Sequence, residues 1–326
     1  MKKLLIIMAV AMIPLFIGCK KQKEFKQEDG QSSEDNRNVQ SECDQAINDA
    51  NNVFSSNGTA YGKTFNAALA ESKLTNGEVC GASIDTTQYL QGIITLNFDG
   101  ITVCDNRKRA GSIKLTLQDF IKGKRWEDQG AVLELVYTDY KVTRASDGKS
   151  IKFNGVVNVT NVTGGNLILL YFGIAPNETR LIHKVEGSNI QIVFDEAKTA
   201  IWNINRQATY TKSMNGNTVV FTCTGEGIGS YNGINNLENW GTTREGDPFT
   251  SQVTEPVIWN TTCGAGAPVT GKLIMKVDSK EFELIITVGV DINGNPVTPA
   301  VNECPYGLKV SWKWKNDTGS KIYPYQ

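Results

Sequence analysis

The sequence predicts an all-β protein, either an antiparallel sandwich or a large curled antiparallel sheet, preceded by a short N-terminal helical segment. From about residue 90 onward, apolar residues recur at every second position, as in Leu273, Met275 and Val277. One apolar and one polar face per strand is typical of antiparallel sheets. Asn-Gly and Asp-Gly pairs, which form tight hairpin turns, separate these segments. The pairs are at residues 99–100, 147–148, 154–155, 215–216, 232–233 and 293–294.

The first residues of the chain have the layout of a secretory signal. Two lysines precede an apolar run, Leu4–Ile17, that contains Pro14 and is too short for a spanning helix, which needs about 20 residues. The segment 16–19, Phe-Ile-Gly-Cys, resembles the lipobox of bacterial lipoproteins, although Phe16 replaces the usual leucine. We expect residues 1–18 to be cleaved as a signal peptide. The resemblance implies that Cys19 then carries acyl chains, palmitate included, which hold the chain in the outer membrane on an undetermined face.

Residues 19–38 are almost entirely polar or charged and are predicted to be a disordered tether with a reach of about 65 Å. A capping box at Ser41 and Asp44 then predicts a helix that ends near residue 55. Its apolar positions have helical spacing: Cys43, Ala46, Ile47, Ala50, Val53 and Phe54. Residues 63–73 are a candidate for a second short helix. Residues 39–326 are expected to form a single, mostly β domain.

Six cysteines remain once Cys19 is assigned to lipid, and an even number in an exported chain favours disulfides. They are Cys43, Cys80, Cys104, Cys223, Cys263 and Cys304. Six cysteines permit 15 pairings. Of these we choose Cys80 with Cys104 and Cys263 with Cys304, which leaves Cys43 and Cys223. No C-x-x-C pair occurs, and the only histidine is far from any cysteine, so no metal site is expected.

Charge and motifs argue against several functions. Without the two signal lysines, the chain has 31 basic and 34 acidic residues, a balance of 31 − 34 = −3. Apart from Arg107–Arg109, it lacks the basic patches that bind nucleic acid. The only histidine, His183, lies in an ordinary strand pattern with no nucleophile motif nearby and is predicted to be exposed. No cofactor is expected. The segment 291–302 fails the calcium-loop pattern because Pro296 replaces the required glycine.

Four segments of the chain resemble a family of uncharacterised lipoproteins from Bacteroidetes-type bacteria. The segments are 104–111 (CDNRKRAG), 157–161 (VNVTN), 202–206 (WNINR), and Trp259 to Cys263 followed by Gly271. The resemblance spans roughly residues 40–315. It implies an envelope location and an all-β fold. It brings no catalytic residues, because the family has no assigned activity.

Residues 225–248 form the longest stretch without a strand pattern and are predicted to be a long loop. The glycines at 225, 227 and 229 indicate flexibility, since no lysine or helix follows to form a phosphate loop. Long loops on rigid sheets often bind ligands, and aromatic residues with a few polar groups suit a glycan or a peptide. The candidate ligand-binding residues are Tyr231, Trp240, Arg244 and Asp247.

We therefore expect a lipid-anchored envelope protein that acts as a binding or structural module, without a catalytic centre. The alternative is a carbohydrate-active hydrolase that uses paired carboxylates. The available carboxylates are Glu134, Asp139, Glu226, Glu238 and Asp247, and no spacing singles out two of them. A third possibility, lipid carriage within the curled sheet, requires an apolar cavity. An open groove at Trp312 and Trp314 would favour binding, whereas burial of these rings would favour a scaffold.

Overall fold

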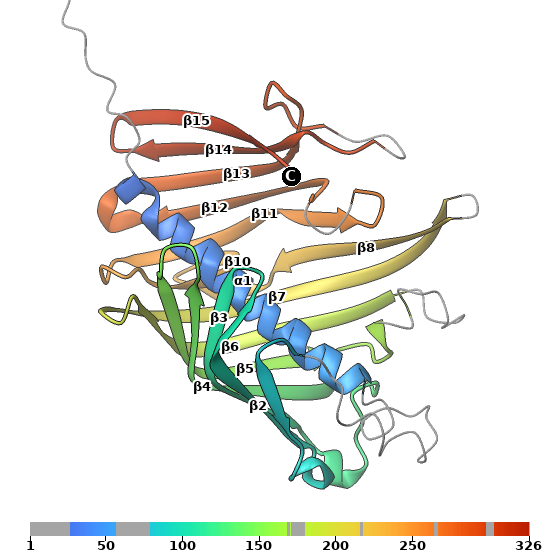
Figure 1. Cartoon of the computed structure of the whole chain (residues 1–326). Coiled ribbons are helices and arrows are strands. Elements are labelled where there is room, and N and C mark those ends of the chain that lie inside the picture. The colour runs from blue at the N-terminus through green and yellow to red at the C-terminus, as the bar shows by residue number, and fades with distance from the viewer. Residues whose placement is uncertain are drawn as a thin grey trace, which may run out of the picture.

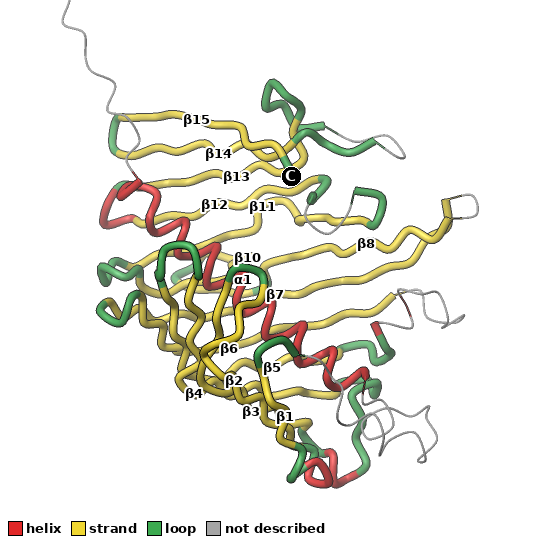
Figure 2. Tube along the Cα trace, viewed as in Figure 1, coloured by secondary structure: helices red, strands yellow, loops and turns green. Residues whose placement is uncertain are grey.

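The structure, a computed structural model, describes residues 27–56, 79–167, 170, 180–215, 218–263, 267–297 and 303–325. It consists of one 15-stranded antiparallel sheet and one long helix, which confirms the predicted all-β class (Figure 1). The sheet is single and curled, so the sandwich alternative does not apply (Figure 2). The elements in chain order are α1 (Gln27–Ser56), β1 (Ala82–Asp85), η2 (Tyr89–Gln91), β2 (Ile93–Cys104), β3 (Arg107–Leu117), η3 (Phe120–Lys122), β4 (Ala131–Arg144), β5 (Ser150–Asn161), β6 (Arg180–Phe194), β7 (Lys198–Asn215), β8 (Thr218–Gly227), β9 (Gly229–Tyr231), β10 (Ile234–Thr242), β11 (Pro248–Asn260), β12 (Thr270–Val277), η4 (Asp278–Lys280), β13 (Phe282–Val290), β14 (Gly307–Trp314) and β15 (Asp317–Pro324).

Most strands pair with their neighbours in sequence, as hairpin turns require. The order runs from β1 to β7 without interruption, continues with β10, and ends at β15. Strand β8 pairs with both β7 and β11, and the short β9 pairs with β10. The strand order therefore departs from the chain order only around β8 to β10, which includes the region in which the sequence predicted a loop.

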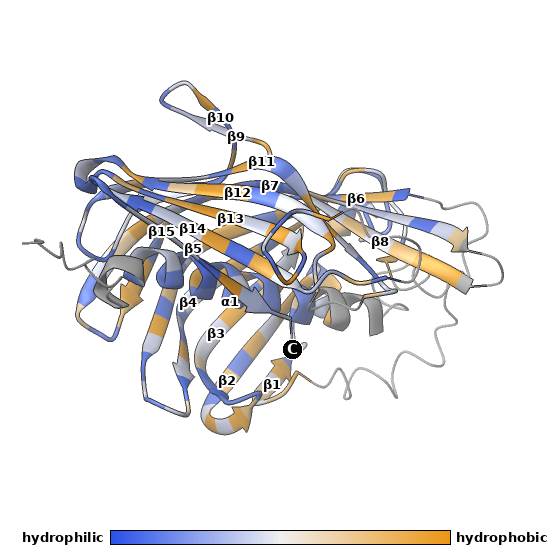
Figure 3. Ribbon diagram, turned by 90° about the horizontal axis from the view of Figure 1, so that it is seen from above, coloured by the Kyte–Doolittle hydropathy of each residue, from blue (hydrophilic) through white to orange (hydrophobic). Residues whose placement is uncertain are grey.

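The two faces of the sheet differ in polarity. In β7, Trp202 and Ile204 are buried against α1, whereas Asn203 and Asn205 point to the opposite side. We call the side packed on α1 the helix face and the opposite side the outer face. Figure 3 shows the sheet curling around α1, while the β9–β10 hairpin rises from the outer face.

A β-bulge between β3 and β4 contributes to the curl. The register shifts at Gly111 and again near Asp139, and both residues have positive φ, 83° and 45°. A Cβ atom on Gly111 would lie only 2.2 Å from the carbonyl oxygen of Asp139. Only glycine allows the two backbones to approach this closely, so it permits the strands to bend toward α1 here.

Helix α1 is longer than predicted. It begins at Gln27, so the tether predicted for residues 19–38 is wrong from residue 27 onward. Packing accounts for the longer helix, because Asp35 and Asn36 are buried in the folded chain although they are polar. In the described part of the chain, no helix has the length and apolarity to cross a membrane. The signal segment, Cys19 and the helix predicted at 63–73 lie outside the described residues.

Helix α1 packs on the sheet through an apolar stripe and a set of ion pairs. The buried apolar residues are Val39, Cys43, Ala46, Ile47, Ala50 and Val53, which follow the predicted helical spacing. Five acidic residues of the helix pair with five arginines of the sheet region: Glu34 with Arg144, Asp35 with Arg244, Glu42 with Arg107, Asp44 with Arg206, and Asp49 with Arg109. Arginine suits such half-buried contacts because its planar fork can hold a carboxylate through two hydrogen bonds. These pairs fix the position of α1 along the helix face.

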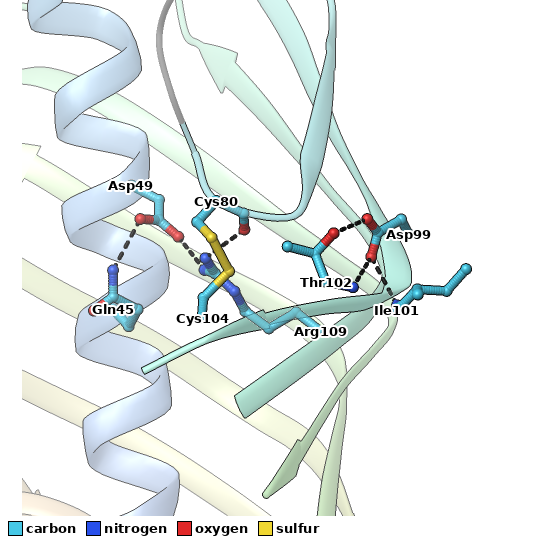
Figure 4. Close-up of a disulfide and its surroundings, with 8 residues drawn as sticks. All are labelled: Gln45, Asp49, Cys80, Asp99, Ile101, Thr102, Cys104 and Arg109. Carbon is cyan, nitrogen blue, oxygen red and sulfur yellow. Dashed lines mark hydrogen bonds and ion pairs between the residues drawn. A yellow bond between two sulfur atoms is a disulfide. The ribbon is translucent and has the colours of Figure 1, made fainter. Parts of the chain in front are cut away.

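Both predicted disulfide pairs are present. Cys80 is bonded to Cys104 and Cys263 to Cys304, with sequence separations of 24 and 41 residues. The first bond fastens the segment before β1 to the end of β2, beside the buried pair Asp49–Arg109 (Figure 4). Cys43 and Cys223 are free thiols. Burial raises the pKa of each to about 11, so both are protonated at neutral pH.

Candidate functional site

The segment predicted as a long loop is mainly strand. Residues 225–227 complete β8, and the chain then forms the β9–β10 hairpin. The glycines at 225, 227 and 229 were expected to make this segment flexible. In the structure they instead allow neighbouring strands to approach closely. A Cβ atom on Gly227 would lie 2.3 Å from the carbonyl oxygen of Asn236 in β10.

The structure brings two of the four candidate ligand-binding residues together. The rings of Tyr231 and Trp240 stack with centroids 6.2 Å apart and an interplanar angle of 18°. Trp240 pairs in register with Asn203 and therefore lies on the outer face. Its ring covers Gly229, where a Cβ atom would lie 2.6 Å from a ring carbon. Tyr231 is 42% exposed, so the stack presents an aromatic surface to solvent.

The other two candidates lie elsewhere and have structural partners. Arg244 binds Asp35 of α1 through Nε at 2.7 Å and Nη2 at 2.6 Å, and it also contacts Asp195 and the ring of Phe194. Asp247 pairs with Lys280, whose hydrogen bond lowers the pKa of the carboxyl group. Arg244 holds the helix, and neither residue joins the aromatic stack.

A row of polar side chains crosses the outer face beside the stack. In β7, Asn203 and Asn205 occupy alternate positions, and the Asn203 amide donates to the carbonyl oxygen of Trp240 at 3.2 Å. Asn205 pairs in register with Glu186 of β6, which pairs with Asn158 of β5. Adjacent side chains in such a row have Cβ atoms about 5 Å apart. The row therefore extends the stack into a polar strip across three strands.

The strip continues to both sides. Glu134 of β4 follows Asn158, and the neighbouring row contains Lys184, Gln207 and Glu226. The sequence analysis considered Glu134 and Glu226 only as catalytic carboxylates, and it did not single out Lys184 or Gln207. The signal was present in the segments 157–161 and 202–206, where Asn158, Asn203 and Asn205 alternate with apolar residues and therefore face away from the core.

Two polar atoms of this strip have no partner. The Oδ1 atoms of Asn158 and Asn205 are shielded from water and accept no hydrogen bond. Glu186 lies between them in the register, and its Oε1 atom accepts from Lys184 Nζ at 2.8 Å. Shielded acceptors without donors are unfavourable, so these two oxygens lower the stability of the folded state.

The carboxylates considered for a hydrolase are dispersed. Glu134 and Glu226 lie on the outer face in different rows, and Asp139 lies at the bulge beside Lys152. Glu238 is buried on the helix face, where it accepts hydrogen bonds from Ser251 at 2.8 Å and Gln40 at 3.0 Å. Burial raises the pKa of Glu238. Asp247 belongs to the Lys280 pair, so the described residues do not assemble two of these carboxylates at one point.

The prediction that His183 is exposed is wrong. The side chain is only 3% exposed and lies between the rings of Trp126 and Tyr210, at 5.4 and 5.5 Å. Burial lowers its pKa to about 4. The alternation of Leu181, His183 and Val185 on one side of β6 was the signal for this position. A neutral histidine enclosed by aromatic rings is a core residue here.

The interior between α1 and the sheet is filled. At the point where Val39 and Cys43 meet the sheet, the gap does not admit a water molecule. The sheet side of this gap is lined by Tyr137, Phe153, Val157, Ile190, Ile192, Trp202 and Ile204. Lipid carriage needs an open apolar cavity, so this packing gives it no support.

The C-terminal tryptophans pack against the core. Trp312 and Trp314 are partly buried and pack against the main hydrophobic cluster. A Cβ atom on Gly319, opposite Trp312 in β15, would lie 2.2 Å from the indole ring. The burial that a scaffold role would require is therefore met only in part by these two rings.

A shallow depression of about 460 Å³ lies at the end of β12–β14, lined mainly by charged residues. Its charges are largely matched, since Lys276 pairs with Glu283 at 3.1 Å.

Asp291 begins a turn in which its carboxylate accepts the backbone N–H groups of Asn293 and Asn295, as an Asn-Gly hairpin predicts. Within the described ranges, no group of three or more histidine, cysteine or acidic residues is arranged to hold a metal ion.

Comparison with known proteins identified no matching family model, curated protein or solved structure. The stacked aromatic pair and the adjoining polar strip are therefore the features of the described residues on which a function can be argued.

Proposed function

We propose that this protein is a lipid-anchored module of the bacterial cell envelope that binds a glycan on its outer face and has no catalytic centre. The observation that carries this proposal is the Tyr231–Trp240 stack beside the strip of Asn203, Asn205 and Glu186. Aromatic rings provide the flat apolar surface on which a sugar ring packs, and amides and carboxylates bind its hydroxyl groups. The signal segment and Cys19 support the envelope location.

The start of α1 determines how far the domain can stand from an anchor at Cys19. Eight peptide steps join Cys19 to Gln27, so the connection spans at most about 28 Å when fully extended. The sequence alone suggested more than twice this reach. On the proposed anchor, the outer face would meet glycans that lie close to the membrane.

Replacing Tyr231 with alanine should weaken glycan binding about five- to tenfold, because one exposed aromatic contact is lost. Binding would be measured by titrating the soluble domain, residues 27–326, with a glycan selected on an array. Tyr323→Ala is the matched control, since Tyr323 is also 42% exposed but lies on β15, outside the strip. Equal loss in the two variants, or binding to peptides alone on parallel arrays, would contradict the proposal.

The hydrolase alternative predicts a different result with chromogenic glycosides. Turnover that disappears in Glu226→Gln, with the fold intact by circular dichroism, would replace binding by catalysis. Saturable binding without turnover supports the proposed module.

A further inference from the structure

The last hairpin of the sheet is basic, whereas the rest of the chain is acidic. Strands β14 and β15 and their turn, residues 307–324, contain four lysines and one acidic residue, a balance of 4 − 1 = +3. The mature chain as a whole has a balance of −3, so its other residues together have −3 − 3 = −6. The lysines are Lys309, Lys313, Lys315 and Lys321, of which the last three are exposed. Net positive charge therefore lies at one edge of the sheet.

Aromatic rings accompany two of these lysines. Lys321 Nζ lies 4.9 Å from the ring centroid of Tyr323, and Lys315 Nζ lies 5.6 Å from that of Trp314. Tyr323 is exposed, and Trp314 is partly buried. Lysines with apolar stems and aromatic rings with one polar group both suit the boundary between lipid headgroups and acyl chains. Charge and rings together match an anionic lipid surface.

The hairpin also forms the long open edge of the sheet. Among the described residues, β15 pairs with β14 alone, so the N–H and C=O groups on its other side have no strand partner. Such an edge invites pairing with other chains unless something covers it. The opposite edge, β1, is only four residues long and has no basic residue. Of the two edges, β15 is thus the one that an anionic surface would cover.

The course of α1 brings the proposed anchor to this hairpin. In the turn between β10 and β11, Arg244 binds Asp35 of α1, and Asp247 pairs with Lys280 of η4, which leads into β13. The N-terminal part of α1 therefore lies at the end of the sheet at which β14 turns into β15 (Figure 1). Four strand spacings, about 19 Å, separate β11 from β15. The connection from Cys19 to the start of α1 spans up to about 28 Å, so a membrane that holds Cys19 is within reach of the hairpin.

Resting on the lipid anchor of the proposed function, we propose that the β14–β15 hairpin is a second membrane contact, with its β15 edge on the anionic headgroups of the bilayer that holds Cys19. The lysines attract the lipid phosphate groups, and the net negative charge of the remaining chain keeps other surfaces away, so the domain takes one orientation. Trp240 is on β10, five strand spacings from β15. This orientation holds the aromatic stack no more than about 24 Å from the headgroups.

The test uses the mature chain with Cys19→Ser, which carries no lipid, so its binding to vesicles does not depend on the anchor. Vesicles of phosphatidylcholine with about one-third phosphatidylglycerol should bind it, and vesicles of phosphatidylcholine alone should not. Lys313→Gln with Lys321→Gln should weaken the binding about tenfold, because each lysine at such a surface contributes up to about fivefold. Added salt should weaken the binding of the native hairpin as well, because it screens surface charges.

Lys108→Gln with Lys114→Gln is the matched control. Both residues are exposed and lie on β3, and the net charge changes by the same amount. This variant should bind the anionic vesicles as tightly as the chain with the native lysines. Hydrogen exchange gives a second readout, since bound vesicles should slow the outward-facing amides of β15 and leave those of β1 unchanged.

The possible outcomes separate this inference from the function on which it rests. No binding to anionic vesicles, equal loss in the two double variants, or unchanged exchange in β15 would overturn the membrane contact and leave glycan binding intact. Polyglutamate that binds as tightly as the vesicles, with the same dependence on Lys313 and Lys321, would make the partner an acidic polymer instead of a lipid. Mass spectrometry that finds Cys19 unmodified in cells would overturn the anchor, and with it the bilayer named here, even where vesicle binding depends on the lysines.

Discussion

Replacing Asp49 with alanine is expected to lower the free energy of unfolding by about 3–5 kcal/mol, because it leaves a buried arginine without its counter-charge. Asp49 of α1 and Arg109 of β3 form an ion pair in which both side chains are 7% exposed. The guanidinium group also donates to the carbonyl oxygen of Cys80 at 2.8 Å and lies 4.8 Å from the ring centroid of Phe98 (Figure 4). Asp49 is held in turn by Gln45 at 2.9 Å. The pair therefore fastens helix, sheet and disulfide segment together.

Urea unfolding monitored by tryptophan fluorescence measures the effect. Asp119→Asn removes the charge of an exposed pair with Lys122 and suits the positive φ of 57° at this position, so it should leave the unfolding free energy within experimental error. The double variant Asp49→Leu with Arg109→Met should recover much of the loss, since an apolar pair of similar size removes the uncompensated charge. A loss below about 1 kcal/mol in Asp49→Ala would show that the pair does not hold the helix.

The class of the fold could be read from the sequence, because alternation and hairpin turns act locally. Positions such as Leu273, Met275 and Val277 alternate in the sequence, and Met275 and Val277 are buried in the core. The extent of α1 could not be read in the same way. Residues 27–38 are polar, and what orders them is contact with distant parts of the chain, as in the Asp35–Arg244 pair, 209 positions apart. The local sequence around residues 27–38 gives no information about such a distant partner.

The candidate site was predictable in part. Tyr231 and Trp240 were chosen for their chemistry and do lie together, but the register that stacks them comes from the β9–β10 hairpin. Arg244 was chosen for the same chemistry, yet it binds Asp35, in a part of α1 that the sequence predicted to be a disordered tether. The polar strip was missed because Asn158, Glu186 and Asn205 come from three strands, and only pairing brings them into one row.

His183 is expected to make the protein less stable as the pH falls from 6.5 to about 4. Burial between Trp126 and Tyr210 lowers its pKa from 6.5 to about 4, because the protonated form is not solvated there. Between these values the unfolded chain binds a proton that the folded chain does not. Each pKa unit corresponds to about 1.36 kcal/mol, so the folded state loses about 3 kcal/mol over this range. Above pH 6.5 the histidine has no effect of this kind.

The effect can be isolated because His183 is the only histidine in the chain. Asp35, Glu42 and Glu238 have pKa values raised by burial, so their contribution changes in the opposite direction, with stability gained as each carboxylate takes up its proton. The His183→Leu variant keeps these three carboxylates. Subtracting its profile of unfolding free energy against pH from that of the native protein should therefore leave only the contribution of the histidine. The single imidazole signal in NMR should titrate near pH 4 in the folded state. A midpoint above 6, or parallel stability profiles for the two proteins, would place the imidazole in contact with solvent.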